Sequence, residues 1–316
     1  MRVLDRAPAA PPATTVEFRL LGPVGLHDLR TGRFVTPAGA KQRALLCALV
    51  CRAGEPLGVD VLVEELWGEE PPANAVNALQ AHATRLRRLL PPSPTRLGWI
   101  RALPTGYLFA LDGVGTDAAR FERLSAQGRS VLPVDPGRAV ELLRLGLSLW
   151  QGPALRDSGQ GSIGRAEADR LEEQRLTALE ALHEAGLACG RHGEITGELE
   201  RLTEDHPVRE RFYDLLMVAL YRSGRQAEAL GTYERARRHL VGTLGIEPGP
   251  ALRSRMEAVL RHSPELAWPP SSPLSVPADV SAELLLLRQR VDELSRSHRA
   301  LAARLANTAG AVDDER

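Results

Sequence analysis

Apolar residues recur three and four positions apart between residues 71 and 90, which is the spacing of one face of an α-helix. This stripe consists of Val76, Leu79, Ala83, Leu86 and Leu90. We therefore predict an amphipathic helix that turns the stripe toward a core, with Pro72 in its first turn, where proline is common. The opposite face carries Asn74, Asn77, Ala81, Thr84, Arg85 and Arg88.

The segments around this helix predict a small α+β domain. The two preceding segments with helical periodicity are residues 38–53 and 59–67, separated by Gly54 and Pro56. The short, turn-bounded runs typical of strands are residues 16–21, 24–29, 33–36, 99–103 and 107–111. The order of a sheet, three helices and a hairpin is typical of a winged helix-turn-helix domain with an N-terminal sheet. We predict this domain over residues 16–112. In that fold the third helix enters the major groove of DNA.

Charge is segregated around the predicted third helix. Residues 71–111 contain five arginines and no acidic residue, whereas residues 55–70 contain six acidic residues and no basic one. A formal net charge of zero for the whole chain hides this separation. The basic segment can neutralise phosphates, and the acidic segment should face away from DNA. Because Asn and Arg match adenine and guanine edges, we predict a recognition helix. The alternative is an ordinary surface helix whose basic end suits the helix dipole.

The middle of the chain repeats with a period of 34 residues, the period of tetratricopeptide repeats. Examples of the paired positions are Leu182 and Leu216, Ala185 and Ala219, Gly190 and Gly224, Glu194 and Glu228. In each copy a glycine ends one helix. The next helix is expected to pack through Ile195, Leu199 and Leu202 in the first copy, and through Ala229, Tyr233 and Ala236 in the second. With flanking helical segments, this predicts an all-α, tetratricopeptide-like domain over residues 117–262 that offers a groove to a protein.

Several short motifs are spread in order along residues 16–263. They are Gly39 to Leu46, Leu66-Trp67-Gly68, Leu79-Gln80, Arg85 to Arg88, Gly106-Tyr107, Phe121-Glu122, Leu149 to Gly152, Tyr221 to Leu230 and Leu244 to Pro250. Together they resemble the SARP (antibiotic regulatory protein) family of actinobacteria. The resemblance implies an OmpR/PhoB-type winged helix joined to a bacterial transcriptional activation domain, and a role in activating biosynthetic gene clusters. By position it suggests base or phosphate contacts from Asn77, Thr84, Arg85 and Arg88, and phosphate contacts from Lys41 and Arg43.

The full set of candidate DNA contacts combines the helix, the start of the first helix and the hairpin. It consists of Asn74, Asn77, His82, Thr84, Arg85, Arg87, Arg88, Lys41, Arg43, Arg101 and Thr105. We expect Arg87 to bind phosphate on any DNA, and Arg101, beside the hairpin turn, to reach backbone or minor groove.

The sequence gives little support for a metal site or a dinucleotide-binding site. Cys47, Cys51 and Cys189 lack metal-ligand spacing, and the first two lie one turn apart in an apolar helix, so core positions in a reducing cytoplasm are expected. The pattern of Gly159, Gly161 and Gly164 fits a dinucleotide fingerprint but lacks the preceding strand that such a site needs. We interpret it as a loop between helices. No catalytic residues, cofactor, metal or membrane segment is predicted.

The ends of the chain are expected to differ from the two domains. Residues 1–15, rich in Ala and Pro, predict a disordered arm without the apolar core of a signal peptide, and residues 264–280 predict a Pro- and Ser-rich linker. In the C-terminal helix predicted at 281–306, apolar positions recur as coiled-coil a and d positions do from Leu284 to Leu305. This helix either forms a zipper with a second copy or docks on the chain's own repeat domain.

These patterns together predict a sequence-specific transcriptional activator without catalytic activity. It would bind direct repeats in promoter DNA as a homodimer, at the nucleoid, and recruit RNA polymerase holoenzyme, as the resemblance implies. Glu64, Glu65, Glu69 and Glu70 are either polymerase contacts or a solvated acidic face. The alternative function is a repeat-protein scaffold whose winged helix does not read DNA.

Overall fold

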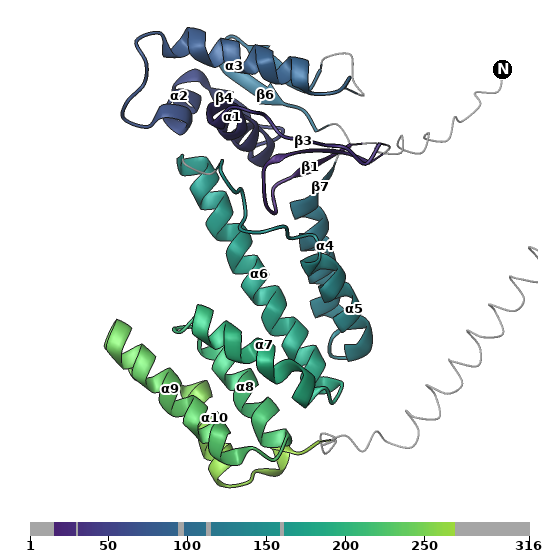
Figure 1. The fold of residues 1–316 in the computed structure, drawn as a ribbon, viewed down its shortest axis with the longest axis vertical. Helices are drawn as coiled ribbons and strands as arrows, with labels where there is room; N and C mark the ends of the chain where they lie inside the picture. Colours follow the sequence, from purple (N-terminus) through teal and green to yellow (C-terminus); the bar gives the residue numbers. More distant parts are fainter. Residues whose placement is uncertain (1–15, 30, 94–97, 112–114, 159–160, 269–316) are drawn as a thin grey trace, which may run out of the picture. The chain divides into compact units, whose positions relative to one another are not determined.

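The computed structural model describes residues 16–29, 31–93, 98–111, 115–158 and 161–268. Two short sheets and three helices come first, and an all-helical region follows (Figure 1). The predicted N-terminal arm, the predicted C-terminal helix and the linker beyond residue 268 lie outside the described residues.

The first part of the chain has the expected winged-helix architecture. Its first sheet has the order β3-β2-β1-β7, in which β1 (Val16–Arg19) pairs antiparallel with β2 (Gly25–Asp28) and parallel with β7 (Gly115–Thr116), and β3 (Phe34–Val35) lies at the edge. The three helices are α1 (Ala40–Cys51), α2 (Val59–Trp67) and α3 (Ala75–Leu89). The second sheet, the wing, has the order β4-β6-β5, from β4 (Pro56–Gly58), β6 (Gly106–Phe109) and β5 (Ile100–Leu103).

The start of α3 differs from the prediction. Pro72 lies before the helix, because Asn74 occupies the N-cap position and the helix begins at Ala75. The Asn74 side chain makes no capping hydrogen bond to the first turn. The stripe is buried at Leu79, Ala83, Leu86 and Leu90, as predicted. The prediction is wrong for Val76, which lies in the first turn of the helix and is 48% exposed.

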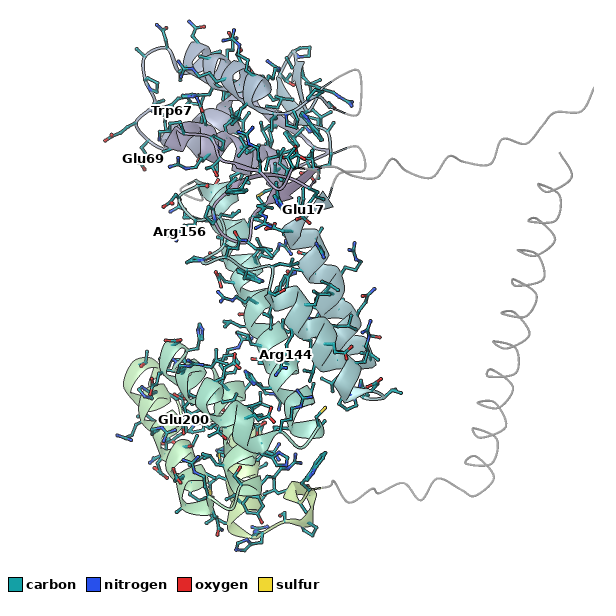
Figure 2. All side chains as sticks on the ribbon, turned by 45° about the vertical axis from the view of Figure 1, so that its right-hand side comes forward. Glu17, Trp67, Glu69, Arg144, Arg156 and Glu200 are labelled. Atoms are coloured by element: carbon teal, nitrogen blue, oxygen red, sulfur yellow. The ribbon has the colours of Figure 1, made fainter. Side chains whose placement is uncertain are left out.

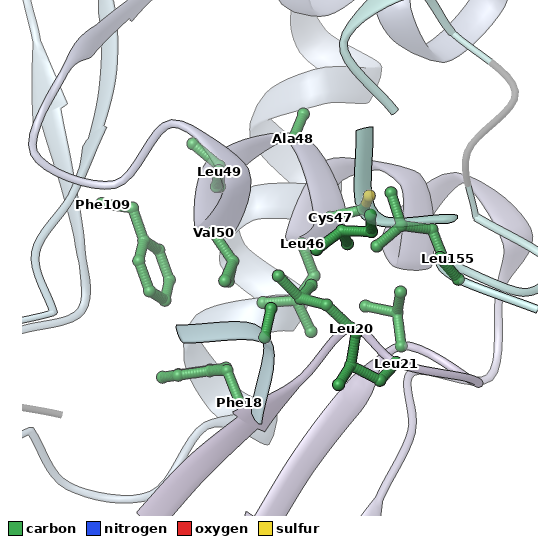
Figure 3. Close-up of a cluster of buried hydrophobic side chains, with 14 of the residues drawn as sticks. Phe18, Leu20, Leu21, Leu46, Cys47, Ala48, Leu49, Val50, Phe109 and Leu155 are labelled. Carbon is green, nitrogen blue, oxygen red and sulfur yellow. The ribbon is translucent and has the colours of Figure 1, made fainter. Parts of the chain in front are cut away.

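The core of the winged helix is built around α1. Residues 44–50 of this helix are all buried, including Cys47, as expected for a core cysteine. Phe18 of β1 packs edge-on against Phe109 and Trp99, with ring centroids 5.2 and 5.4 Å apart. Figure 3 shows that Leu20, Leu21 and Leu155 join the same cluster. Since Leu155 comes from the segment before α6, the core continues into the helical part of the chain.

Seven helices follow in the described part of the chain. They are α4 (Asp117–Val131), α5 (Pro136–Leu147), α6 (Ser162–Ala188), α7 (His192–Asp205), α8 (Glu210–Arg222), α9 (Gln226–Leu244) and α10 (Pro250–Leu260). The ends of α6 and α8 lie 34 residues apart (188 and 222), and so do the starts of α7 and α9 (192 and 226). Gly190 and Gly224, which follow the first helix of each pair, have left-handed φ values of 75° and 77°, conformations that favour glycine.

The expected core positions of both helix pairs are turned inward. Ile195, Leu199, Ala229, Tyr233 and Ala236 are buried, and Leu202 is partly buried against the same cluster. The helices that repeat with the 34-residue period therefore form the second hydrophobic core.

The helical region extends further than the sequence suggests. Pro264–Leu266 forms a short 3-10 helix, where the sequence predicts the start of a linker. Leu266 is fully buried, and its carbonyl accepts a hydrogen bond from Arg222 Nε at 2.9 Å. The apolar side chain and the paired carbonyl hold these residues on α8 despite the neighbouring proline.

A buried carboxylate joins the first sheet to α4. Asp117 is 2% exposed and accepts hydrogen bonds from the backbone N–H groups of Leu20 (2.8 Å), Leu21 (3.2 Å) and Ala118 (2.8 Å). Burial raises the pKa of Asp117 to about 6, although these N–H groups favour the ionised form.

The pH dependence of unfolding should report this carboxyl. Because the folded pKa of about 6 exceeds the ordinary 3.8, the stability that Asp117 contributes is full below pH 3.8 and is lost as pH rises through 6. Relative to an Asp117→Asn variant, the parent chain should gain about 1 kcal/mol of unfolding free energy between pH 7 and pH 5. Urea unfolding of both proteins at the two pH values measures this difference, and an unchanged difference would contradict the raised pKa.

Candidate nucleic-acid interface

One face of α3 is open to solvent and carries polar side chains. At 100° per residue, Asn77, Ala81, Thr84, Arg85 and Arg88 lie within about a quarter of the helix circumference. All five are exposed, while the opposite face packs into the core. The structure therefore brings the central members of the predicted set together on one surface.

The polar side chains on this face are not used within the protein. Asn77, Thr84, Arg85 and Arg88 make no hydrogen bond or ion pair with the rest of the described chain. Gln80 is also exposed, on the flank of the same face next to Asn77. Sequence reasoning did not propose Gln80 as a contact, although glutamine pairs with adenine as asparagine does, and its place on the helical wheel was the available signal.

Arg87 has a different environment from its neighbours. Its Nε donates a hydrogen bond to the carbonyl of Ile100 at 3.1 Å, and its guanidinium lies 5.8 Å from the centre of the Tyr107 ring. Both partners belong to the wing. Arg87 therefore connects α3 to the wing, in addition to the phosphate contact expected of it.

An Arg87→Ala variant should lose about 1 kcal/mol of unfolding free energy, because it removes a charged hydrogen bond and a cation–π contact at a partly exposed site. It should also weaken binding to all DNA sequences similarly. Arg88→Ala is the matched control, since Arg88 is exposed and unpaired and its loss should leave unfolding unchanged. Urea unfolding of the three proteins makes the comparison, and equal stabilities would show that Arg87 does not support the wing.

The wing is held close to the start of α2. The N–H of Val59 donates to the carbonyl of Thr105 at 3.0 Å, and Thr105 itself is exposed at the turn between β5 and β6. At Gly106, an added Cβ would lie 1.8 Å from the carbonyl oxygen of Leu57. Only glycine, which has no Cβ, allows β6 to lie this close to β4. Arg101, on β5, is half-buried, so only part of its side chain faces solvent.

Three other candidates lie against the protein itself. Lys41 Nζ donates to the carbonyl of Leu66, and Arg43 Nη1 donates to the carbonyls of Pro37 (3.1 Å) and Ala38 (3.0 Å). The ring of His82 is 6.1 Å from the ring of Trp67.

Positive charges surround His82. Burial, and then the positive charges of Arg85 and Lys41, lower the pKa of His82 and favour its neutral form. The structure thus does not bring Lys41, Arg43 or His82 to the open face of α3. Asn74 is exposed just before that face begins.

The acidic residues of α2 and the following turn also separate into two groups. Glu64, Glu69 and Glu70 are exposed, whereas Glu65 is 3% exposed. The prediction that Glu65 is a surface contact for polymerase, or part of a solvated face, is wrong. Glu65 lies on the side of α2 that holds Leu62 and Leu66, and its carboxylate binds the start of α6.

Other functional groups are not assembled in the described residues. No three His, Cys, Asp or Glu side chains within residues 16–268, the gaps excepted, are placed to hold a metal ion. None of the described helices combines the length and the apolar character needed to cross a membrane. In the described chain, the element that precedes Gly161 is helix α5, and Gly164 lies within α6.

Comparison with protein families divides the chain at the same place as the fold. Residues 36–109 match the family described as transcriptional regulatory protein, C terminal. Residues 116–260 match the bacterial transcriptional activator domain. The open face of α3 lies in the first match, and α4 to α10 lie in the second.

Several characterised proteins are similar over most of the chain. Transcriptional regulator RedD of Streptomyces coelicolor is 45% identical over 257 residues, which cover 80% of this chain and 73% of RedD. Regulatory protein DnrI of Streptomyces peucetius is 37% identical, covering 79% of this chain and 93% of DnrI. For regulatory protein AfsR of Streptomyces coelicolor, at 40% identity, the match spans only 25% of the relative. The structure of Mycobacterium tuberculosis EmbR in complex with a low affinity phosphopeptide has a TM-score of 0.73 and 33% identity, and the match covers 88% of this chain and 72% of that chain.

Proposed function

The chain belongs to the SARP family of transcriptional regulators, and we propose that it activates transcription by reading a DNA sequence with the open face of α3. The observation that carries this proposal is the set of exposed, unpaired side chains at Asn77, Thr84, Arg85 and Arg88. Arg and Asn can each form paired hydrogen bonds with guanine or adenine in the major groove.

The charge around α3 supports the same function. The chain from residue 71 to residue 111 carries five arginines and no acidic residue, and the exposed acids Glu64, Glu69 and Glu70 precede it. A surface of this kind attracts the phosphate backbone and orients the protein on it. The wing, fixed by Arg87 and Gly106, would lie beside the same duplex.

The relatives support a more specific proposal about the target. We infer that the chain binds direct repeats near a promoter as a homodimer, that it recruits RNA polymerase there, and that the genes it controls form a secondary-metabolite cluster. The helical region from α4 to α10 would provide the contact for the transcription machinery. No enzymatic step is part of this function.

Binding across a salt series tests the proposal. The full-length protein is titrated with promoter fragments from the genes that flank its own gene, and with random DNA of equal length. We expect tighter binding to at least one promoter fragment, with the logarithm of affinity falling linearly with the logarithm of salt concentration. Equal binding to both DNAs, or no binding at low salt, would overturn the proposal and favour a protein-binding scaffold.

A further inference from the structure

The N-terminus of α6 is capped by a side chain from the DNA-binding part of the chain. The Glu65 carboxylate accepts hydrogen bonds from the backbone N–H groups of Ile163 (2.8 Å) and Gly164 (2.9 Å), and from the Ser162 hydroxyl (3.4 Å). The first N–H groups of a helix have no partner within the helix, and a carboxylate is favoured beside them. Glu65 lies on α2, almost a hundred residues earlier in the chain. Its carboxylate therefore supplies both the missing acceptors and the favourable negative charge at the start of α6.

Gly161 allows this approach. A Cβ at residue 161 would lie 2.2 Å from Cδ and 2.5 Å from the backbone oxygen of Glu65. Any larger residue would push α2 and α6 apart. The glycine that resembles part of a nucleotide fingerprint thus has a different use, as the site where two helices meet.

One side of this contact borders open space. A cavity of about 550 Å³ opens beside it, lined by Lys41, Trp67, Glu69 and Arg165 among others. Trp67, the last residue of α2, and Glu69, on the turn that follows, are labelled in Figure 2. Ile163, in the first turn of α6, also packs against the first core, so the hydrogen bonds of Glu65 act together with this apolar contact to hold the turn.

The position of α6 makes this restraint important. The helix has 27 residues, about 40 Å at 1.5 Å per residue, and it contributes to both hydrophobic cores. Leu171, Ala178, Ala181 and Ala185 belong to the first core, and Leu187, in the last turn, belongs to the second. A tilt of about 10° at its start would therefore move its far end by roughly 7 Å.

We propose that Glu65 and the first turn of α6 form a latch that fixes the direction of α6 on the winged helix, so that the activating surface is held in one orientation relative to bound DNA. The latch rests on the proposed function. It makes Glu65 a positioning residue: transcriptional activation depends on it, whereas the affinity for DNA, which arises on α3, does not.

Glu65→Gln is the direct test of the latch. Glutamine keeps the size of the side chain, but its amide nitrogen must face one of the two N–H donors. Glu64→Gln is the matched control, because Glu64 is the neighbouring residue on the same helix and is exposed. Gly161→Ala displaces the carboxylate without altering it and serves as a second, independent variant.

Hydrogen exchange reports the contact without reference to DNA. In the full-length Glu65→Gln variant, the amides of Ile163 and Gly164 should exchange at least tenfold faster than in the parent, while the buried amides of α8 keep their rates. Glu64→Gln should leave all of them unchanged. Unchanged protection at Ile163 and Gly164 in Glu65→Gln would overturn the latch even if the protein proves not to bind DNA.

Reporter expression and DNA binding then separate positioning from folding. On a DNA site selected from a random library with the parent protein, Glu65→Gln and Gly161→Ala should bind within twofold of the parent. Expression of a reporter gene behind that site should fall several-fold for both variants. Full activation by both variants, or a parallel loss of DNA affinity and helical content, would overturn the proposal.

Discussion

An Arg85→Ala variant should bind its preferred DNA site roughly 10- to 100-fold more weakly than the parent chain, a loss of about 1–3 kcal/mol. Arg85 is exposed in the centre of the open face of α3 and makes no hydrogen bond or ion pair with the described residues. Its guanidinium is thus available for paired hydrogen bonds to a guanine edge. Since no contact within the protein is lost, the midpoint of urea unfolding should stay the same.

The change in DNA sequence preference of the Arg85→Ala variant distinguishes a base contact from a phosphate contact. If Arg85 reads a base, the variant loses more affinity for the selected site than for random DNA, and other bases become tolerated at one position. Arg129→Ala removes the same charge from an exposed position on α4 and serves as the control for the overall charge. Equal losses on both DNAs would assign Arg85 to phosphate, and no loss would remove α3 from the interface.

A Gly106→Ala variant should lose about 3 kcal/mol or more of unfolding free energy. The added Cβ would lie 1.8 Å from the Leu57 oxygen and 2.8 Å from the Leu57 carbonyl carbon, so it overlaps backbone that cannot rotate away. Strand β6 would have to leave β4, and the wing would separate from the start of α2. DNA affinity should fall together with stability, because the wing no longer has a fixed place beside α3.

Gly115→Ala is the control for the change of residue type. Gly115 also lies in a strand, but an added Cβ there meets nothing within 4 Å. Its urea unfolding should match that of the parent within about 0.5 kcal/mol. If Gly106→Ala were as stable as this control, the close approach of β6 to β4 would be incorrect.

Periodicity predicted much of the fold because most elements are long enough to repeat their pattern. Helix α2 has the predicted limits, and the 34-residue spacing matches the ends of α6 and α8 and the starts of α7 and α9. Short elements have no such signal. Strand β4 has three residues and β7 has two, so neither shows alternation, and both depend on partners distant in sequence.

The candidate site could be predicted only in part, because a helical wheel shows direction but not neighbours. It correctly placed Asn77 and Arg85 on an open face. It could not show that Arg87 bonds to Ile100 or that His82 lies against Trp67, since these partners come from other elements. Glu65 was assigned to the surface because charged residues are rarely buried unless paired. Its partners are backbone N–H groups, which sequence composition does not reveal.

The pairing between the end of β1 and the segment before α6 limits how regulators of this kind can be recombined. The N–H groups of Gln151, Leu155 and Arg156 donate to the carbonyls of residues 21, 20 and 22. A chimaera joined at residue 112, where the winged helix ends in sequence, would leave these carbonyls unpaired and expose Leu20 and Leu21. A transplantable DNA-reading module must therefore carry its own copy of residues 151–164, so the exchangeable unit is discontinuous in sequence.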